Sequence, residues 1–241
     1  MENLSLHGLR IWISGSIPSN DDTQKEQVSK CVAALTRAIL KNGGCVAHGC
    51  HPSITEIIGH EAIFHKNQTG NNTKELVFYF VSRFFISDYK SDLPRWEKYA
   101  NVIETPAIND EKNARDASLK VMRDYLCARS DVIIAIGGDT WDELPARAGV
   151  AAEVQMAIEN NLPCFVLGGF GGSAERIKPI IIENHYSLKN GLDSERNIQL
   201  ATCDDPDKCT TIVIEQLSRL PIAAVTTKIS GGTFRILCLD G

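Results

Sequence analysis

The stretch from residue 131 to residue 174 constrains the fold more than any other part of the chain. It contains two short apolar runs, 132–136 and Cys164–Leu167, and a pair of glycines follows each run. Apolar runs of this length that end in glycines are typical of buried parallel strands. Between them, apolar residues recur at helical spacing over 150–158, which predicts a helix. The stretch therefore predicts a strand–helix–strand unit with its glycines at the strand ends, where ligands bind in open α/β sheets.

The rest of the chain repeats this alternation. Further strands are predicted over 9–14, Cys45–His48 and 75–86, with a short extended piece at 102–104. Apolar spacing predicts helices that begin at 21–23 and end before Asn42, and helices over 54–64, 94–99, 110–129, 174–183 and 207–220. The polar region from 184 to 205 carries no predicted element. The pattern predicts the α/β class, with a doubly wound, mostly parallel Rossmann-like sheet in one domain over residues 1–222.

Composition narrows the class of partner. At 241 residues and 43% hydrophobic, the chain can bury a substantial core. The net charge of −5 lacks the excess of basic residues that binding to duplex nucleic acid usually requires, so we expect no such binding. Because no apolar run reaches the length of a membrane span and no secretory signal is present, we expect a cytoplasmic domain without membrane contact of its own. The eight cysteines form no CxxC pair, which favours free thiols that fill the core over a metal site. We expect no metal and no cofactor.

The glycines that follow the predicted strands allow two interpretations. In a nucleotide pocket, Gly137 and Gly138 let backbone amides approach a phosphate, and the Glu153 carboxylate accepts hydrogen bonds from ribose or acts in acid/base chemistry. The alternative is tight strand–helix packing with a solvent-facing glutamate. Glycines on the neighbouring strand, Gly169 and Gly171 around Phe170, favour the pocket. Neither GxGxxG nor GxxxxGK[ST] occurs, so neither a dinucleotide fingerprint nor a P-loop is predicted.

Two other polar residues are candidates for ligand contacts. His51 precedes Pro52 directly after a predicted strand, which places it at the edge of the site, whereas His48 within the strand is interpreted as a core residue. Arg83 lies among aromatic residues and is predicted either to clamp a phosphate or to extend its charged end from the edge of the sheet. Asp139, which follows the glycine pair, completes the candidates.

Five segments in a fixed order carry a resemblance to a known family. They are RIWISGSI, GGCVAHGCHPSI, MRDYLCARSDVIIAIGG, GVAAEVQMA and LPCFVLGGFGG, and they span most of 9–183. Together they resemble the SLOG superfamily, a Rossmann-like group that includes DNA-processing-protein A and the "lonely guy" phosphoribohydrolases. The resemblance implies that glycine loops and nearby polar residues bind a nucleotide or a nucleotide-derived signal. Carried over residue by residue, it places in the pocket Gly15, Ser16, Gly49, His51, Arg123, Gly137, Gly138 and Glu153.

The spacing between the predicted strand over 132–136 and the helix over 150–158 differs from that in the hydrolase branch of this superfamily. That branch carries a compact GGxGTxxE, whereas here a longer polar insert separates Thr140 from Glu153. The departure favours binding over hydrolysis, as in the sensory domains of Thoeris-type antiviral effectors, which the resemblance also includes. If the chain is instead a nucleoside-monophosphate phosphoribohydrolase, Glu153 is the acid/base and Arg123 holds the phosphate.

The last nine residues, TFRILCLDG, resemble the opening strand of patatin-like phospholipases, which continues into an oxyanion-hole loop. No GxSxG nucleophile elbow occurs, so no lipase chemistry is expected within these residues. We interpret 223–241 as a linker and the first strand of a fused effector; the alternative is an unrelated apolar strand before Asp-Gly. The resemblance then implies a homo-oligomeric sensor of a cyclic or ADP-ribose-derived nucleotide that controls a patatin-like phospholipase, in bacterial antiviral defence.

Overall fold

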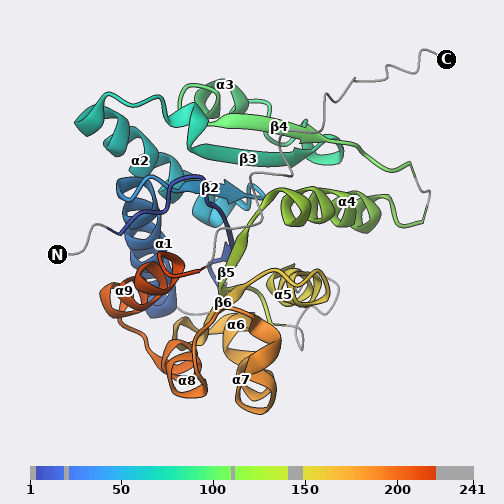
Figure 1. Ribbon diagram of the computed structural model, residues 1–241. Coiled ribbons are helices and arrows are strands. Elements are labelled where there is room, and N and C mark those ends of the chain that lie inside the picture. The colour runs from blue at the N-terminus through green and yellow to red at the C-terminus, as the bar shows by residue number, and fades with distance from the viewer. Residues whose placement is uncertain (1–3, 19–21, 110–111, 141–148, 221–241) are drawn as a thin grey trace.

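The computed structural model describes residues 4–18, 22–109, 112–140 and 149–220, and Figure 1 shows their arrangement. Within these residues the strands form one six-stranded parallel sheet in the order β4-β3-β2-β1-β5-β6. Its members are β1 (Arg10–Ser16), β2 (Cys45–His48), β3 (Val77–Ser82), β4 (Asn101–Thr105), β5 (Val132–Gly137) and β6 (Cys164–Leu167). The predicted parallel α/β sheet is confirmed. The predicted linker and strand beyond residue 222, and the insert at 141–148, lie outside the described residues.

Helices connect the strands and cover both faces of the sheet (Figure 1). They are α1 (Asp22–Lys41), α2 (Pro52–Thr69), α3 (Leu93–Trp96), α4 (Ala114–Arg129), α5 (Gly149–Glu159), α6 (Gly172–Arg176), α7 (Lys178–Asn184), α8 (Ser194–Thr202) and α9 (Pro206–Leu217). No helix within the described residues combines the length and the apolar character needed to cross a membrane.

Side-chain alternation along the buried strands divides the core into two layers. From β1, Ile11 and Ile13 pack in the layer that contains residues of α1, α2 and α9, whereas Trp12 packs in the layer that contains residues of α4 and α5. Successive residues of a strand point to opposite faces, so a strand covered on both sides must be apolar at nearly every position. This requirement explains the uninterrupted apolar runs, and the two layers make the fold doubly wound and Rossmann-like.

The order of the strands reverses between β1 and β5. The chain adds β2, β3 and β4 on one side of β1 and then returns to place β5 on the other side. In the paired register Ser14 lies beside Ala135 and Ser16 beside Gly137, so the carboxyl ends of the two strands coincide. Connections leave in opposite directions from such a point and open a crevice, which is where ligands bind in this class of sheet.

Two helical regions differ from the sequence-based expectation. The polar region at 184–205 contains α8, whose first turn is capped by the Asp193 carboxylate, which accepts a hydrogen bond from the Arg196 amide at 2.8 Å. Its buried residues are only Asn197, Leu200 and Ala201, so few apolar residues mark this helix in the sequence. The helix predicted over 174–183 is divided into α6 and α7, because Pro179 lies in the first turn of α7 and supplies no amide to a continuous helix.

Candidate functional site

A cavity of about 300 Å³ lies at the carboxyl ends of β1, β2, β3 and β5. It occupies the point at which the strand order reverses. The cavity brings together predicted site residues from five parts of the chain: Gly15, Ser16, Gly49, His51, Arg123, Asp139 and Glu153. Their shared position supports the sequence-based choice of this sheet edge, while their contact with a ligand stays a prediction.

Glu153 is the centre of the polar contacts in the cavity. One carboxylate oxygen accepts a hydrogen bond from the Ser14 hydroxyl at 2.6 Å, and the other lies 3.1 Å from Nε of Arg123. The side chains of Arg123 and Glu153 are only 19% and 14% exposed. Charge-assisted hydrogen bonds of this kind hold both side chains in one orientation. The remaining carboxylate lone pairs and guanidinium N–H groups can therefore meet a ligand from fixed positions.

Backbone dipoles also make the electrostatic potential of the cavity more positive. The first residues of α5, Gly149 and Val150, and the residues that begin α2, His51 and Pro52, all line it. The N-terminus of a helix carries a partial positive charge and unpaired amides, which favour a phosphate or carboxylate. Arg115, in the first turn of α4, adds a half-exposed cation to the lining. This arrangement suits an anionic ligand that also carries hydroxyl groups.

Hydrogen bonds fix His51 at the start of α2. Its Nδ1 lies 2.8 Å from the Ser53 hydroxyl, which in turn accepts a hydrogen bond from the Ile17 amide at 3.0 Å. The Ser53 hydroxyl proton is then available to Nδ1, so Nε2 carries the ring proton and can donate to a ligand. Desolvation by the surrounding protein lowers the pKa of His51, and the negative charge of Asp139 partly offsets this effect. His51 is therefore a neutral donor near pH 7.

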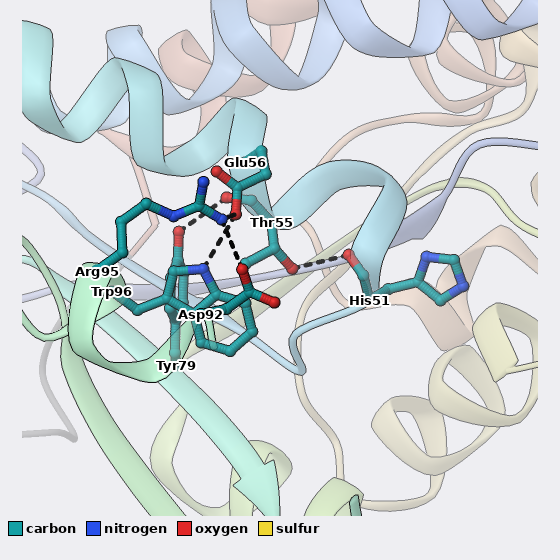
Figure 2. Close-up of polar contacts among 7 residues, drawn as sticks. All are labelled: His51, Thr55, Glu56, Tyr79, Asp92, Arg95 and Trp96. Carbon is teal, nitrogen blue, oxygen red and sulfur yellow. Dashed lines mark hydrogen bonds and ion pairs between the residues drawn. The ribbon is translucent and has the colours of Figure 1, made fainter. Parts of the chain in front are cut away.

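A second set of contacts holds the first turns of α2 against the sheet and α3 (Figure 2). The Thr55 hydroxyl donates to the His51 carbonyl at 2.7 Å, and the Tyr79 hydroxyl of β3 donates to the Thr55 carbonyl at 2.9 Å. In Figure 2 the His51 ring projects away from these contacts, which engage only its backbone. The imidazole is thus presented by a rigid support and stays available to the cavity.

His48 supports the same loop from within the core. Its Nδ1–H donates to the Ile13 carbonyl at 2.9 Å, and its Nε2 accepts from the His51 amide at 3.0 Å. The bond that Nε2 accepts requires the neutral ring, and complete burial lowers the pKa of His48 to about 4. The prediction of a core histidine is consistent with this burial, although the residue also borders the cavity.

The buried histidine makes folding sensitive to acid. An unfolded chain protonates His48 near pH 6.5, whereas the folded chain resists protonation until about pH 4. Protons then bind preferentially to the unfolded state as the pH falls through this window. We expect the free energy of unfolding to fall by roughly 3 kcal/mol between pH 7 and pH 4 from this residue. Urea unfolding at a series of pH values measures the loss.

A His48→Gln variant is the control for this pH dependence, because glutamine can both donate and accept but does not titrate in this range. The variant should lose less stability than the wild type between pH 6.5 and pH 4. The pKa of His51 is shifted in the same direction, so a smaller slope remains. Equal slopes for the two proteins would show that His48 is not the group responsible.

Comparison with known proteins identifies the family of this chain. A family model described as SLOG cluster2 matches residues 64–200, which is more than half of the chain. The chain belongs to this SLOG family. Among solved structures, the X-ray structure of TM1055, a structural-genomics target, is similar, with a TM-score of 0.47 and 21% identity over 78% of this chain and 88% of that chain. A resemblance of this size adds no argument about function. No curated protein matches the chain.

The SLOG match and the fold together make this a nucleotide-related Rossmann-like domain. The matched segment contains Arg123, Asp139 and Glu153, and it runs from the last turns of α2 to α8. The strand β1, which supplies Ser14, and the start of α2, which supplies His51, precede it. The cavity therefore combines residues inside the SLOG match with residues before it.

The glycine pairs of this SLOG domain lie outside the cavity. The Gly138 amide donates to the Ser16 carbonyl at 2.8 Å, and the Gly138 carbonyl accepts from the Ser173 amide at 3.0 Å. Gly169 packs against the backbone of Cys203, Gly171 packs against the side chain of Gln24, and Phe170 is buried in the core. These glycines, Gly137 included, serve close packing of the strand ends, which is the alternative stated for them above. Their contact with a ligand stays a prediction.

Arg83 also lies away from the cavity. Its Nε pairs with the Glu104 carboxylate at 3.0 Å on the outer side of β3 and β4, and its side chain is 67% exposed. The strand β3 ends at Ser82, one residue earlier, and the chain turns there so that Phe85 lines the cavity. The structure thus places Arg83 at the edge of the sheet, which is the second of the two roles predicted for it.

Ser14, Tyr89 and Arg115 are among the lining residues that the sequence analysis did not place in the site. Ser14 carries a usable signal, because it is a polar residue within an apolar strand on the same face as Trp12. Tyr89 carries none, since it lies in a polar, irregular segment, and Arg115 carries none because it is one of several charged residues in the predicted helix over 110–129. Among the described residues, no group of three or more His, Cys, Asp or Glu side chains is arranged to hold a metal ion.

Proposed function

We propose that this SLOG domain binds a nucleotide signal in the cavity between β1 and β5. The observation that carries the proposal is the Arg123–Glu153 pair, nearly buried at 3.1 Å beside the N-termini of α2 and α5. A phosphate would lie against the helix N-termini and accept from His51. Ribose hydroxyls would donate to the Glu153 carboxylate, whose orientation Ser14 and Arg123 fix.

The proposal includes a relay to an effector. Residues 233–241 resemble the opening strand of a patatin-like phospholipase, which is the support for a fused lipase under nucleotide control, in antiviral defence. The ligand would act by population shift, because it can favour only the arrangement that it binds more tightly. Assembly of several copies is the bistable step that we propose.

A separate observation favours a second candidate function, phosphoribohydrolase activity. In the phosphoribohydrolase branch of the resemblance, an arginine and a glutamate act together, and the longer insert before α5 argued against this arrangement. Arg123 and Glu153 lie 3.1 Å apart, which supports a joint role, although the insert lengthens the spacing between the glycine pair and Glu153. Hydrolysis of a nucleoside monophosphate to base and ribose phosphate, with Glu153 as acid/base, is therefore the alternative.

A thermal-unfolding screen tests both functions. We expect at least one compound from a panel of AMP, NAD, cyclic ADP-ribose isomers and cyclic dinucleotides to stabilise the chain. A ligand at a hundred times its Kd adds about 2.7 kcal/mol to the free energy of unfolding. Chromatography of each stabilising compound separates the two functions: an intact ligand supports the sensor, and free base with ribose phosphate supports the hydrolase. Stabilisation by no compound would contradict both.

A further inference from the structure

The cavity has a wall that neither the phosphate nor the ribose contacts use. Phe85 and Tyr89 line it from the segment that follows β3, and Leu119 and Met122 line it from α4. Phe85, Tyr89 and Leu119 are half-buried, so part of each remains free to meet a ligand. The Tyr89 hydroxyl has no hydrogen-bond partner among the described residues. We call Phe85 and Tyr89 the aromatic wall.

Ring contacts hold the aromatic wall in place. The Tyr89 ring lies 5.3 Å from the Trp96 ring, and Phe85 makes an edge contact with Phe84 at 4.9 Å between centroids. Arg115 lies over the Phe85 ring at 5.8 Å, which places a cation beside the wall. Aromatic rings supported in this way lose little freedom when a flat ligand stacks on them.

One carboxylate connects the aromatic wall to the polar part of the cavity. Glu56 of α2 accepts from the Trp96 indole at 3.1 Å and from Arg95 at 2.5 Å, as Figure 2 shows. The helix that carries Glu56 begins at His51, so it supports both the phosphate side and the aromatic side. The two sides are therefore held at a fixed separation before any ligand arrives.

On the basis of the proposed function, we infer that the aromatic wall is the nucleobase subsite of the cavity. A base stacks on a flat, half-buried π surface, and a phosphate does not. The cavity volume of about 300 Å³ lies at the lower end for small-molecule sites, which corresponds to one nucleotide unit. The expected ligand is an intact nucleotide with its base. A larger ligand would place one of its nucleotide units in the cavity.

The test compares ligands with and without a base. Wild-type chain and a Phe85→Ala variant are titrated with the four nucleoside 5′-monophosphates and with ribose 5-phosphate by equilibrium dialysis, and recovered ligand is identified by chromatography. We expect the wild type to bind at least one monophosphate about tenfold or more tightly than ribose 5-phosphate. Phe85→Ala should lower the affinity for that monophosphate about tenfold and change ribose 5-phosphate less than twofold.

Two further variants make the result specific. Tyr89→Phe keeps the ring and should preserve most of the preference for the base, whereas Phe64→Ala removes a 48% exposed phenylalanine at the far end of α2 and should change nothing. Equal binding of the monophosphate and ribose 5-phosphate by the wild type would overturn the base subsite alone, as would equal losses of both in Phe85→Ala. If the wild type binds none of these five compounds but NAD or a cyclic nucleotide stabilises it, the base subsite for one nucleotide unit is overturned alone. Failure of every compound in both experiments would overturn the proposed function with it.

Discussion

A Glu153→Ala variant is expected to bind its nucleotide about a hundredfold more weakly than the wild type. The change removes the acceptor for ribose hydroxyls, and it also releases Arg123, which is only 19% exposed and pairs with Glu153 at 3.1 Å. The Ser14 hydroxyl, buried in β1, loses its acceptor as well. We expect a loss of stability of about 2 kcal/mol from the unpaired groups, less than for a fully buried pair because the cavity admits water. Dialysis and urea unfolding measure the two effects.

Glu159→Ala is the matched control, because it removes the same side chain from the exposed end of the same helix. Its affinity and stability should equal those of the wild type within error. If the chain is a hydrolase, Glu153→Ala should also lower the rate of base release by a factor of about 100 or more. A folded Glu153→Ala protein with unchanged affinity would refute the assignment of this cavity.

A Gly172→Ala variant is expected to be strongly destabilised. Gly172 has φ +68°, and a Cβ atom there would lie 2.2 Å from the Gly138 carbonyl oxygen and 2.8 Å from the Gly137 carbonyl carbon. Both neighbours are backbone atoms at the end of β5, so neither can move aside alone. We expect a loss of about 4 kcal/mol and a Tm lower by roughly 10 °C. Calorimetry measures both.

Gly70→Ala separates the two causes of this loss. Gly70 also has positive φ, +74°, but no atom lies within 4 Å of its Cβ position. The variant should therefore lose only the cost of the left-handed backbone, about 1 kcal/mol. Equal losses at the two positions would mean that close packing between the glycine turns contributes nothing.

The sheet and the location of the site followed from the sequence because both depend on local patterns. A strand covered on both faces must be apolar throughout, and β2 and β6 have the predicted bounds. The glycines at 137–138 and 168–169 mark the carboxyl edge of the sheet, where the cavity lies. Whether the Gly138 amide meets a phosphate or the Ser16 carbonyl depends on tertiary packing, and the same residues suit either outcome.

No local sequence pattern predicts the aromatic wall, the Glu56–Trp96 contact that supports it or the Arg123–Glu153 pair. Glu56 and Trp96 are 40 residues apart in sequence, and Arg123 and Glu153 are 30 apart. Residues so far apart are not related by helical or strand spacing, so hydrophobic periodicity cannot predict their contacts. For Arg123 and Glu153 the family resemblance supplied the pairing. For Tyr89 nothing in the sequence supplied it, because its role depends on how the segment after β3 docks on α2.

We propose that one nucleotide unit binds across the reversal between β1 and β5. A crystal structure of the chain with the compound that stabilises it most tests this binding site directly. We expect phosphate density beside His51 and the N-terminus of α5, ribose beside Glu153, and the base on Phe85. Ligand density at any other place on the chain, with the Arg123–Glu153 pair untouched, would contradict it.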